Sequence, residues 1–322
     1  LSTTIMSDVT AIQTLVEKRL ALKKEISKII VGQDLVVDQV LLSIFSGGHA
    51  LLVGVPGLAK TLMVNTIAQA LGLDFKRIQF TPDLMPSDII GAETLDKERN
   101  IKFIKGPIFA HIILADEINR TPPKTQSALL ESMQEYHVTV AGVRYPIAAP
   151  FFVLATQNPI EQEGTYPLPE AQLDRFMFMV SLDYPTFEQE LSIVKNTTSV
   201  KKITPKRIIN AEEILYFQQL VRRVPIADNV LEYAVKLVHK TRPNREGATE
   251  ITNQYLDWGA GPRASQNLVL AAKCHALINS KYSPDIADVQ AVAEAVLRHR
   301  IIRNFRAEAE GQTVEKIIAQ LL

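Results

Sequence analysis

A glycine-containing turn after a short apolar run constrains this chain more than any other feature. The segment reads LLVGVPGLAKT over residues 51–61. It matches the phosphate-binding pattern G-x-x-x-x-G-K-[ST] at every defined position except one, where Ala59 replaces the second glycine. A strand over residues 50–53 would bring the backbone to the turn, and a helix beginning near Lys60 would point its positive dipole end at the same place. The pattern predicts a strand, a phosphate-binding loop and a helix.

The residues of this loop have separate expected parts in binding ATP and Mg²⁺. Gly54 and Gly57 let backbone N–H groups point inward, and Lys60 would reach the β- and γ-phosphates as a point charge. The Thr61 hydroxyl would ligate Mg²⁺. A methyl group at Ala59 requires a negative φ, so we expect that residue to avoid the left-handed region. The expected nucleotide contacts in the loop are Gly54, Val55, Pro56, Gly57, Leu58, Ala59, Lys60, Thr61 and Leu62.

A second apolar run ends in two adjacent carboxylates. Residues 111–118 read HIILADEI, as a buried parallel strand does when it ends at the carboxyl edge of a sheet. Asp116 would hold Mg²⁺ through its water shell, and Glu117 would polarise the water that attacks the γ-phosphate. An isolated Asp-Glu pair would more simply begin an exposed loop. Its position beyond a phosphate-binding loop favours the catalytic interpretation.

Composition excludes several classes of protein. The chain has 322 residues, 47% of them hydrophobic, which suits one large or two ordinary domains. Lysine plus arginine equals aspartate plus glutamate at 35 each, so no overall basic field would draw the chain to nucleic acid or an anionic membrane. The single Cys274 excludes an internal disulfide and a Cys-rich zinc site. No apolar run approaches the roughly 18 residues needed to span a bilayer, and no signal peptide precedes the first helix, so we expect a cytoplasmic protein.

Hydrophobic periodicity divides the chain near Pro185. Before that point helical and strand patterns alternate, which indicates a parallel α/β sheet; beyond it nearly everything has helical period. We therefore expect an α/β nucleotide-binding domain over residues 1–185, including N-terminal helices, and a helical domain over residues 186–322, with Trp258 packed inside it. Expected elements are helices over 9–30, 35–45, 60–71 and 121–135, strands over 76–80, 151–155 and 176–180, and hairpins over 93–104 and 138–145.

Two polar residues extend the site along the sheet edge. Asn158 follows the strand over 151–155 and could hold the attacking water or a γ-phosphate oxygen. Alternatively it serves only as a turn residue before Pro159. Arg175 precedes the next strand, at the rim of the domain, where it could enter another subunit's active site as an arginine finger. Its alternative is a salt bridge with Asp174 or Glu170.

A further arginine begins a helix in the second domain. Arg263 lies beside a proline in the first turn, where a positive charge opposes the helix dipole unless an anion lies opposite. A γ-phosphate would be such an anion. The alternative is an ordinary surface arginine.

Taken together, these segments resemble the AAA+ ATPases, and more narrowly the MoxR family. The similarity rests on VGQ at 31–33, GVPGLAKT at 54–61, ADEINR at 115–120, PPKTQS at 122–127, ATQNP at 155–159, EAQLDRF at 170–176 and GPRA at 261–264, in that order. It covers most of the chain. Ala59 is similar to a variant common in that family.

The resemblance implies a fold and a set of roles. The fold is an α/β P-loop NTPase (AAA+) domain with a parallel sheet in an αβα arrangement, followed by an all-helical lid. Val31, Gly32 and Gln33 would also contact the nucleotide, Asn158 would be sensor 1, Arg175 the finger and Arg263 sensor 2. The family also implies a hexameric ring with ATP at subunit interfaces. The two hairpins would be the helix-2 insert and the pre-sensor-1 hairpin.

The resemblance further implies a chaperone-like protein that remodels or activates a protein client, or helps to load its metal cofactor. That client could be a protein with a von Willebrand factor A domain. A nucleic-acid motor is an alternative, because Lys97, Arg99, Lys102 and Arg144 lie near the hairpin tips, but Asp96 and Glu98 lie there too. A nucleotide-gated scaffold with little turnover is a third, which Glu117 argues against.

Overall fold

A five-stranded parallel sheet organises the first half of the chain. The computed structural model describes residues 8–95, 98–161, 163–198 and 203–322. The strands run in the order β2-β5-β8-β1-β9. Their bounds are β1 Ala50–Val53, β2 Phe75–Gln79, β5 Ile112–Asp116, β8 Phe152–Gln157 and β9 Phe178–Ser181. β1 thus lies between β8 and β9, and the carboxyl ends of β5, β8 and β1 are adjacent along one edge.

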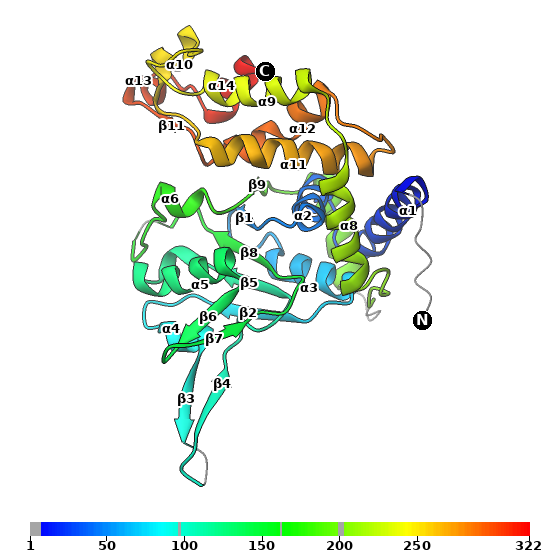
Figure 1. Cartoon of the computed structure of the whole chain (residues 1–322), viewed down its shortest axis with the longest axis vertical. Helices are drawn as coiled ribbons and strands as arrows, with labels where there is room; N and C mark the ends of the chain where they lie inside the picture. The colour runs from blue at the N-terminus through cyan, green and yellow to red at the C-terminus, as the bar shows by residue number, and fades with distance from the viewer. Residues whose placement is uncertain (1–7, 96–97, 162, 199–202) are drawn as a thin grey trace.

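Alternate side chains of these strands enter two apolar cores, one on each face of the sheet. In β1, Leu51 enters one core and Leu52 the other, and Val153 and Leu154 of β8 divide in the same way. Helices cover both faces (Figure 1). The helices before the lid are α1 Asp8–Ile26, α2 Asp34–Ser46, α3 Lys60–Leu71, α4 Pro86–Ile90, η1 Ile118–Arg120, α5 Pro123–Glu135 and α6 Glu170–Leu173. The predicted strands and helices are confirmed to within a few residues.

Two antiparallel hairpins interrupt the alternation, as predicted. One pairs β3 (Gly91–Leu95) with β4 (Ile101–Lys105), and the other pairs β6 (His137–Val140) with β7 (Val143–Pro146). The first hairpin extends well beyond the body of the molecule (Figure 1). Asp96 and Lys97, two of the residues expected near the tip of the first hairpin, lie outside the described residues.

The second half of the chain is helical. Its helices are α7 Phe187–Thr197, α8 Ala211–Arg223, α9 Asp228–Lys240, α10 Glu250–Tyr255, α11 Pro262–Ile278, α12 Ile286–Leu297, α13 Phe305–Ala309 and α14 Val314–Leu321. A short ribbon of β10 (Leu256–Trp258) and β11 (Ile302–Arg303), which the sequence did not indicate, joins them. Trp258 is 68% exposed, so the expectation that it packs inside this domain was wrong. Strand β10 has only three residues, so the sequence contains too short an alternation of apolar and polar positions to predict that Trp258 is exposed.

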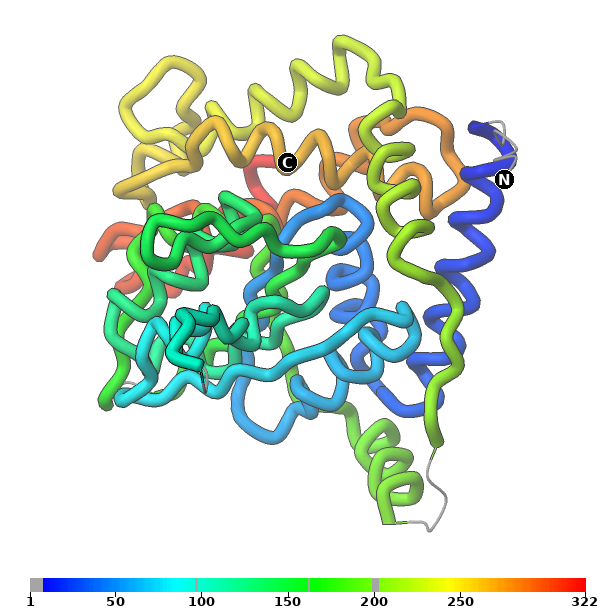
Figure 2. Tube along the Cα trace, turned by 60° about the horizontal axis from the view of Figure 1, so that its bottom comes forward, coloured from blue at the N-terminus to red at the C-terminus, as the bar shows by residue number. Residues whose placement is uncertain are grey.

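The boundary near Pro185 stays a prediction. Helix α8, which follows that boundary, packs against α1 and α2, and one continuous apolar core includes residues of α2, α8 and α11. Helix α7 is different: it stands away from the rest of the chain (Figure 2).

Candidate functional site

The phosphate loop leaves the sheet beside the end of β8. Gly54 donates its backbone N–H to the carbonyl oxygen of Gln157 at 3.2 Å. At Gly57, φ is +88° and nothing lies within 4 Å of where a Cβ would stand, so this part of the loop is open. Ala59 has a φ of +54°, contrary to the negative value expected. The left-handed conformation costs a residue with a Cβ about 1–2 kcal/mol, and the loop geometry imposes it here.

Lys60 bends back over this open loop. Its Nζ donates to the carbonyl oxygens of Gly54 at 2.6 Å and Val55 at 3.4 Å. Partial burial lowers the pKa of Lys60, while the charges of Asp116 and Glu117 act in the opposite direction. Both carboxylates are therefore close enough to interact with this ammonium. The three groups predicted to act together lie on one edge of the sheet.

The loop and the first turn of α3 suit a polyphosphate. Ala59 occupies the N-cap position of α3 without a side-chain hydrogen bond to the helix N–H groups, so these donors have no acceptor from the cap. An ammonium held by carbonyl oxygens, an open glycine turn and a free helix start together form an anion-binding site. A β,γ-phosphate pair fits these donors.

Asp116 ends β5 in a buried, fully hydrogen-bonded position. Its Oδ1 accepts from the hydroxyl of Thr156 at 2.6 Å, and its Oδ2 lies 2.6 Å from Nη2 of Arg77. Only 7% of Asp116 is exposed, and a buried carboxylate needs such partners. Arg77 comes from the neighbouring strand β2.

Glu117 is held back by three neighbouring groups. Its φ of +57° turns the chain out of β5, and its backbone N–H donates to the Thr156 hydroxyl at 2.8 Å. The Gln79 amide donates to Oε2 of Glu117 at 2.9 Å, and Nε of Arg120 lies 3.3 Å from the same oxygen. Thr156 therefore fixes Asp116 and Glu117 together, and Gln79 and Arg120 occupy the side-chain oxygen of Glu117.

Asn158 lies just beyond β8 and is almost fully buried. Its Nδ2 donates to Oε2 of Glu161 at 3.3 Å, and its Oδ1 accepts from the N–H of Ile160 at 3.2 Å. Glu161 also forms an ion pair with Arg120. The hydrogen bond from Ile160 is the kind that the alternative role of Asn158, a turn residue, would use. The contact with Glu161 also connects Asn158 to Arg120, which lies beside Glu117.

The turn at Val31, Gly32 and Gln33 connects α1 and α2 and contacts the segment that follows β9. Gln33 donates its amide to the carbonyl oxygen of Asp183 at 3.1 Å, just after β9. A Cβ at Gly54 would lie 2.8 Å from that of Leu182, in the same segment. Gln33 and Gly54 therefore both contact the segment that contains Leu182 and Asp183.

Arg175 and Arg263 line one cavity of about 230 Å³. Its wall also includes His49, Tyr136 and Asn267. Arg175 donates to the carbonyl oxygen of Leu130. Among the described residues it forms no ion pair with Asp174 or Glu170, so the salt-bridge alternative for Arg175 is absent from this structure.

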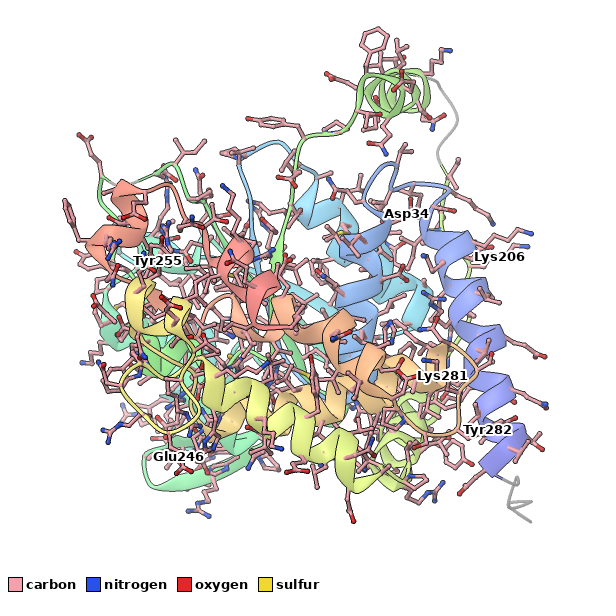
Figure 3. All side chains as sticks on the ribbon, turned by 90° about the horizontal axis from the view of Figure 1, so that it is seen from above. Asp34, Lys206, Glu246, Tyr255, Lys281 and Tyr282 are labelled. Atoms are coloured by element: carbon pink, nitrogen blue, oxygen red, sulfur yellow. The ribbon has the colours of Figure 1, made fainter. Side chains whose placement is uncertain are left out.

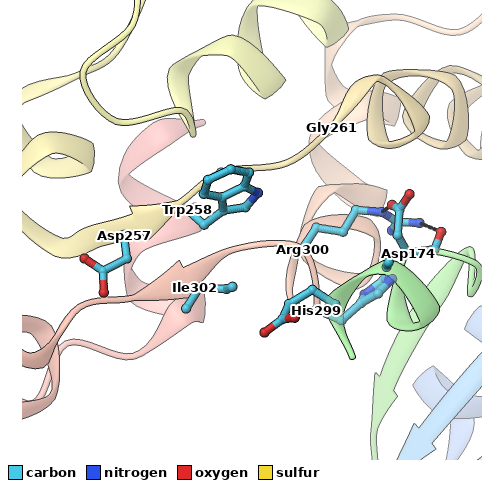
Figure 4. A pocket seen from close by; sticks show the side chains of 10 residues that line it. Asp174, Asp257, Trp258, Gly261, His299, Arg300 and Ile302 are labelled. Carbon is cyan, nitrogen blue, oxygen red and sulfur yellow. Dashed lines mark hydrogen bonds and ion pairs between the residues drawn. The ribbon is translucent and has the colours of Figure 1, made fainter. Parts of the chain in front are cut away.

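Asp174 instead binds two other arginines. Nη1 of Arg263 lies 3.1 Å from its Oδ2. Nε of the buried Arg300 lies 2.7 Å from its Oδ1 (Figure 4). Arg263, in the first turn of α11, is thus held against Asp174 at the end of α6, and it lines the same cavity as Arg175. No contact between Arg263 and the phosphate loop of its own chain accompanies this arrangement in the described residues.

Five polar partners of the site were missed by sequence reasoning: Arg77, Gln79, Arg120, Thr156 and Glu161. Gln79 and Thr156 follow from the fold once β2 and β8 are known to end beside β5, because the carboxyl ends of parallel strands meet. The other three depend on side-chain directions that periodicity does not supply.

Mg²⁺ would have oxygen donors from Thr61 and Asp116. The described residues contain no cluster of three or more His, Cys, Asp or Glu suited to hold a metal alone. Mg²⁺ commonly uses one or two protein ligands together with phosphate oxygens and water.

Comparisons with known proteins agree with this geometry. The family described as "ATPase family associated with various cellular activities (AAA)" matches residues 49–178, and the AAA lid domain matches residues 248–321. The "Chaperone MoxR1" of Mycobacterium tuberculosis is 43% identical over 92% of this chain and 79% of its own length. The chain belongs to the MoxR family of AAA+ ATPases.

Two further matches extend the comparison. "Protein MoxR" of Methylorubrum extorquens is 27% identical over 87% of this chain and 86% of its own. A crystal structure of a protein from Cytophaga hutchinsonii superposes with a TM-score of 0.90 at 44% identity, covering 97% of this chain and 95% of that one. The predicted AAA+ fold, a P-loop domain followed by a helical lid, is confirmed. No helix in the described part of the chain is long and apolar enough to cross a membrane.

Proposed function

We propose that this MoxR-family protein binds and hydrolyses ATP with Mg²⁺, and uses the cycle to remodel or activate a protein client, including by loading a metal cofactor. The observation that carries the ATPase proposal is the arrangement of Lys60, Asp116 and Glu117 at one edge of the sheet, in front of an open glycine turn. Lys60 would neutralise phosphate charge, Asp116 would hold the metal ion, and Glu117 would activate the attacking water.

Binding uses the loop and the start of α3. Lys60 exchanges its two carbonyl partners for the β- and γ-phosphates, and the uncapped N–H groups of α3 donate to the same oxygens. Thr61 and Asp116 would hold Mg²⁺, which neutralises charge on the phosphate oxygens when bound. Arg77 must share Asp116 with that ion, because its guanidinium lies on one carboxylate oxygen.

Water activation requires Glu117 to change partners. In this structure Oε2 of Glu117 accepts from the Gln79 amide and lies 3.3 Å from Nε of Arg120, so these two side chains occupy the oxygen that would accept from water. Glu117 acts as a base when it leaves Gln79 and accepts from a water in front of the phosphates. Asn158 positions that water or a phosphate oxygen, and its contact with Glu161 connects it to Arg120.

Arg175 and Arg263 complete the site of a neighbouring subunit in a ring, which we propose to be hexameric. They line one cavity, so one nucleotide from the adjacent copy would meet both guanidinium groups. Arginines that approach from another subunit stabilise the charge of phosphoryl transfer.

The protruding hairpin favours a protein client over nucleic acid. Leu95, Ile101 and Ile104 on β3 and β4 are 64%, 70% and 57% exposed. Exposed apolar side chains on one projection suit contact with another protein, whereas a nucleic-acid surface would present mainly cations. A von Willebrand factor A protein is one candidate client.

Steady-state phosphate release and nucleotide affinity test the proposed activity. The wild-type chain should release phosphate from ATP only with Mg²⁺, and addition of EDTA should abolish release. A chain that binds ATP with Mg²⁺ but never releases phosphate at any protein concentration would be a scaffold and not an ATPase. Salt-sensitive DNA binding would instead support the motor alternative.

A further inference from the structure

Helix α7 carries an apolar stripe that nothing in the described chain covers. Phe187, Leu191 and Val194 are 72%, 44% and 51% exposed, and their i, i+4, i+7 spacing places them on one face. No residue of the helix is buried. The helix nevertheless begins with a complete capping box at Thr186. An 11-residue helix is marginal by itself, so this face suits a partner surface.

The position of α7 connects it to the nucleotide site. The side chain of Gln189, in its first turn, lies against the turn at Gly32, within 2.6 Å of where a Cβ would stand. The segment before α7 contains Leu182, which packs on Gly54 of the phosphate loop. From there α7 projects away from the body, on the side opposite to α9 (Figures 2 and 3).

A groove on that opposite side matches the stripe in chemistry. A cavity of about 590 Å³ lies between the end of α8 and the helices α9 and α11. Leu231 and Val235 of α9, which are 40% and 38% exposed, and Val269 and Leu270 of α11 form its apolar wall. Its basic residues are Arg222 and Lys273.

The first turn of α7 is acidic and the groove is basic, while Lys195 lies in the last turn of α7. Glu188 and Glu190 in the first turns of α7 form no ion pair among the described residues, and neither do Arg222 and Lys273 in the groove. Lys273 donates only to a backbone carbonyl, that of Arg222 at 3.4 Å. Opposite potentials favour docking of one surface on the other.

The two surfaces also match in length. Phe187 to Val194 spans about 10 Å of helix axis, and so do the seven residue steps from Gln266 to Lys273 on α11. Because α7 and the groove face opposite sides, α7 cannot enter the groove of its own chain (Figure 3). Joining them between copies is a head-to-tail contact, which closes into a ring when the rotation permits.

We propose that α7 of one copy of this chain docks in the groove between α8, α9 and α11 of a second copy. The inference rests on the proposed function, because it explains how the nucleotide site of one copy is brought to Arg175 and Arg263 of its neighbour. Gln266 and Asn267 line both this groove and the cavity of Arg175 and Arg263. A docked α7 therefore carries its own phosphate loop toward the two arginines of the neighbour.

Two substitutions test the two sides of this contact. Leu191→Asp places a carboxylate in the stripe, and Leu231→Asp places one in the groove. Ser192→Asp and Asn229→Asp are matched controls, which add the same group about 100° and 200° around each helix, outside the contact. With ATP, each contact variant should remain a monomer by native mass spectrometry while it binds a fluorescent ATP analogue, and the wild type and both controls should assemble.

A mixture of the two variants makes the test directional. The intact groove of Leu191→Asp can accept the intact α7 of Leu231→Asp, but the pair offers no further working contact. The equimolar mixture should therefore give one-to-one pairs and nothing larger. Wild-type-like assembly of either variant alone, or a mixture that gives no pairs, would overturn the proposal and leave α7 to another occupant, such as a client.

Crosslinking provides a second measurement. The only native cysteine, Cys274, is buried, and burial raises its pKa to about 12, so it should not react. Val194→Cys mixed with Val235→Cys should form crosslinked dimers with a short bismaleimide when ATP is present, and neither alone should. Absence of the mixed dimer in assembled protein would count against the contact. Failure of the wild-type chain to bind or hydrolyse ATP would refute the ATPase proposal separately.

Discussion

Lys60 and Glu117 lie on one edge of the sheet but have different partners, so their loss should have different effects. Lys60→Ala removes the cation whose Nζ now binds the loop carbonyls, and should abolish tight ATP binding. Glu117→Gln preserves shape and should keep binding, while turnover falls about 10²–10⁴-fold, the usual contribution of a positioned base. Nucleotide affinity and phosphate release separate the two. Wild-type turnover by Glu117→Gln would remove Glu117 from the mechanism.

Thr156 holds both acidic residues through a single hydroxyl. The hydroxyl donates to Asp116 and accepts from the backbone N–H of Glu117, and the side chain is fully buried. Thr156→Val keeps the shape but leaves both groups unsatisfied. We expect the free energy of unfolding to fall by about 1–3 kcal/mol and turnover to fall more than ATP affinity.

Denaturant unfolding and phosphate release measure the two effects of Thr156→Val. Thr156→Ser, which keeps the hydroxyl, is the control and should restore most of the turnover. Equal turnover in the valine and serine variants would show that this hydroxyl does not position Glu117.

His49 joins two elements and gives the fold a pH dependence. Its Nδ1 accepts from the N–H of Val153 in β8 at 2.9 Å, so its Nε2 carries the proton and donates to the carbonyl oxygen of Met133 in α5 at 3.2 Å. A second proton on Nδ1 would oppose the Val153 N–H. Burial lowers the pKa of His49 from 6.5 to about 4.

Stability should consequently fall with pH between those two values. From about pH 6.5 down to about pH 4 the unfolded chain binds a proton at His49 that the folded chain does not. The loss approaches about 3 kcal/mol at the acid end, by the usual 1.36 kcal/mol per pH unit. Burial also lowers the pKa of His299, which acts in the same direction. Urea unfolding should give a smaller free energy of unfolding at pH 5 than at pH 7. In His49→Gln the difference between the two pH values should be smaller; a difference equal to that of the wild type would contradict this role of His49.

The elements of this fold were more predictable than the connections between their side chains. Residues 50–61 contain an apolar strand, a glycine turn and a helix start, so the local sequence pattern is sufficient to predict these elements. The carboxyl end of β5 was predicted from the apolar run before Asp116. The partners of Asp116 and Glu117 come from β2 and β8, whose adjacency depends on the sheet order. The expectation of a negative φ at Ala59 was wrong, because the loop imposes a left-handed conformation that alanine does not prefer.

The β3–β4 hairpin supplies no residue to the nucleotide site, so its exposed side chains should be separable from catalysis. Replacement of Leu95, Ile101 and Ile104 by serine should leave basal ATP hydrolysis within about twofold, because surface changes rarely disturb a distant site. Client-stimulated hydrolysis should be lost. Replacement of the exposed Lys102 by serine is the control for general loss of surface. A triple variant that stays folded but fails to bind ATP would make the hairpin a structural support instead.

At the scale of the assembly, the positions of Arg175 and Arg263 decide which copy supplies them. Both line one cavity on the side of β9 and α11, whereas Lys60 lies over the loop after β1. Arg175→Ala and Arg263→Ala should each bind ATP yet hydrolyse it slowly. An arginine acting between subunits contributes about 10³–10⁵ in rate.

Mixing variants tests this arrangement directly. Lys60→Ala and Arg175→Ala should each be inactive alone, but a mixed ring contains interfaces that pair an intact Lys60 loop with an intact Arg175, and these should hydrolyse ATP. Arg263→Ala should complement Lys60→Ala in the same way and should fail to complement Arg175→Ala fully, because the two arginines act on one nucleotide. The control is the chain that carries both Lys60→Ala and Arg175→Ala, mixed with either single variant. The double variant supplies neither intact residue, so no interface in these mixtures pairs an intact Lys60 with an intact Arg175, and no activity should return. If mixed oligomers are verified by mass and no activity returns, both arginines act within their own chain, and the shared cavity has another purpose.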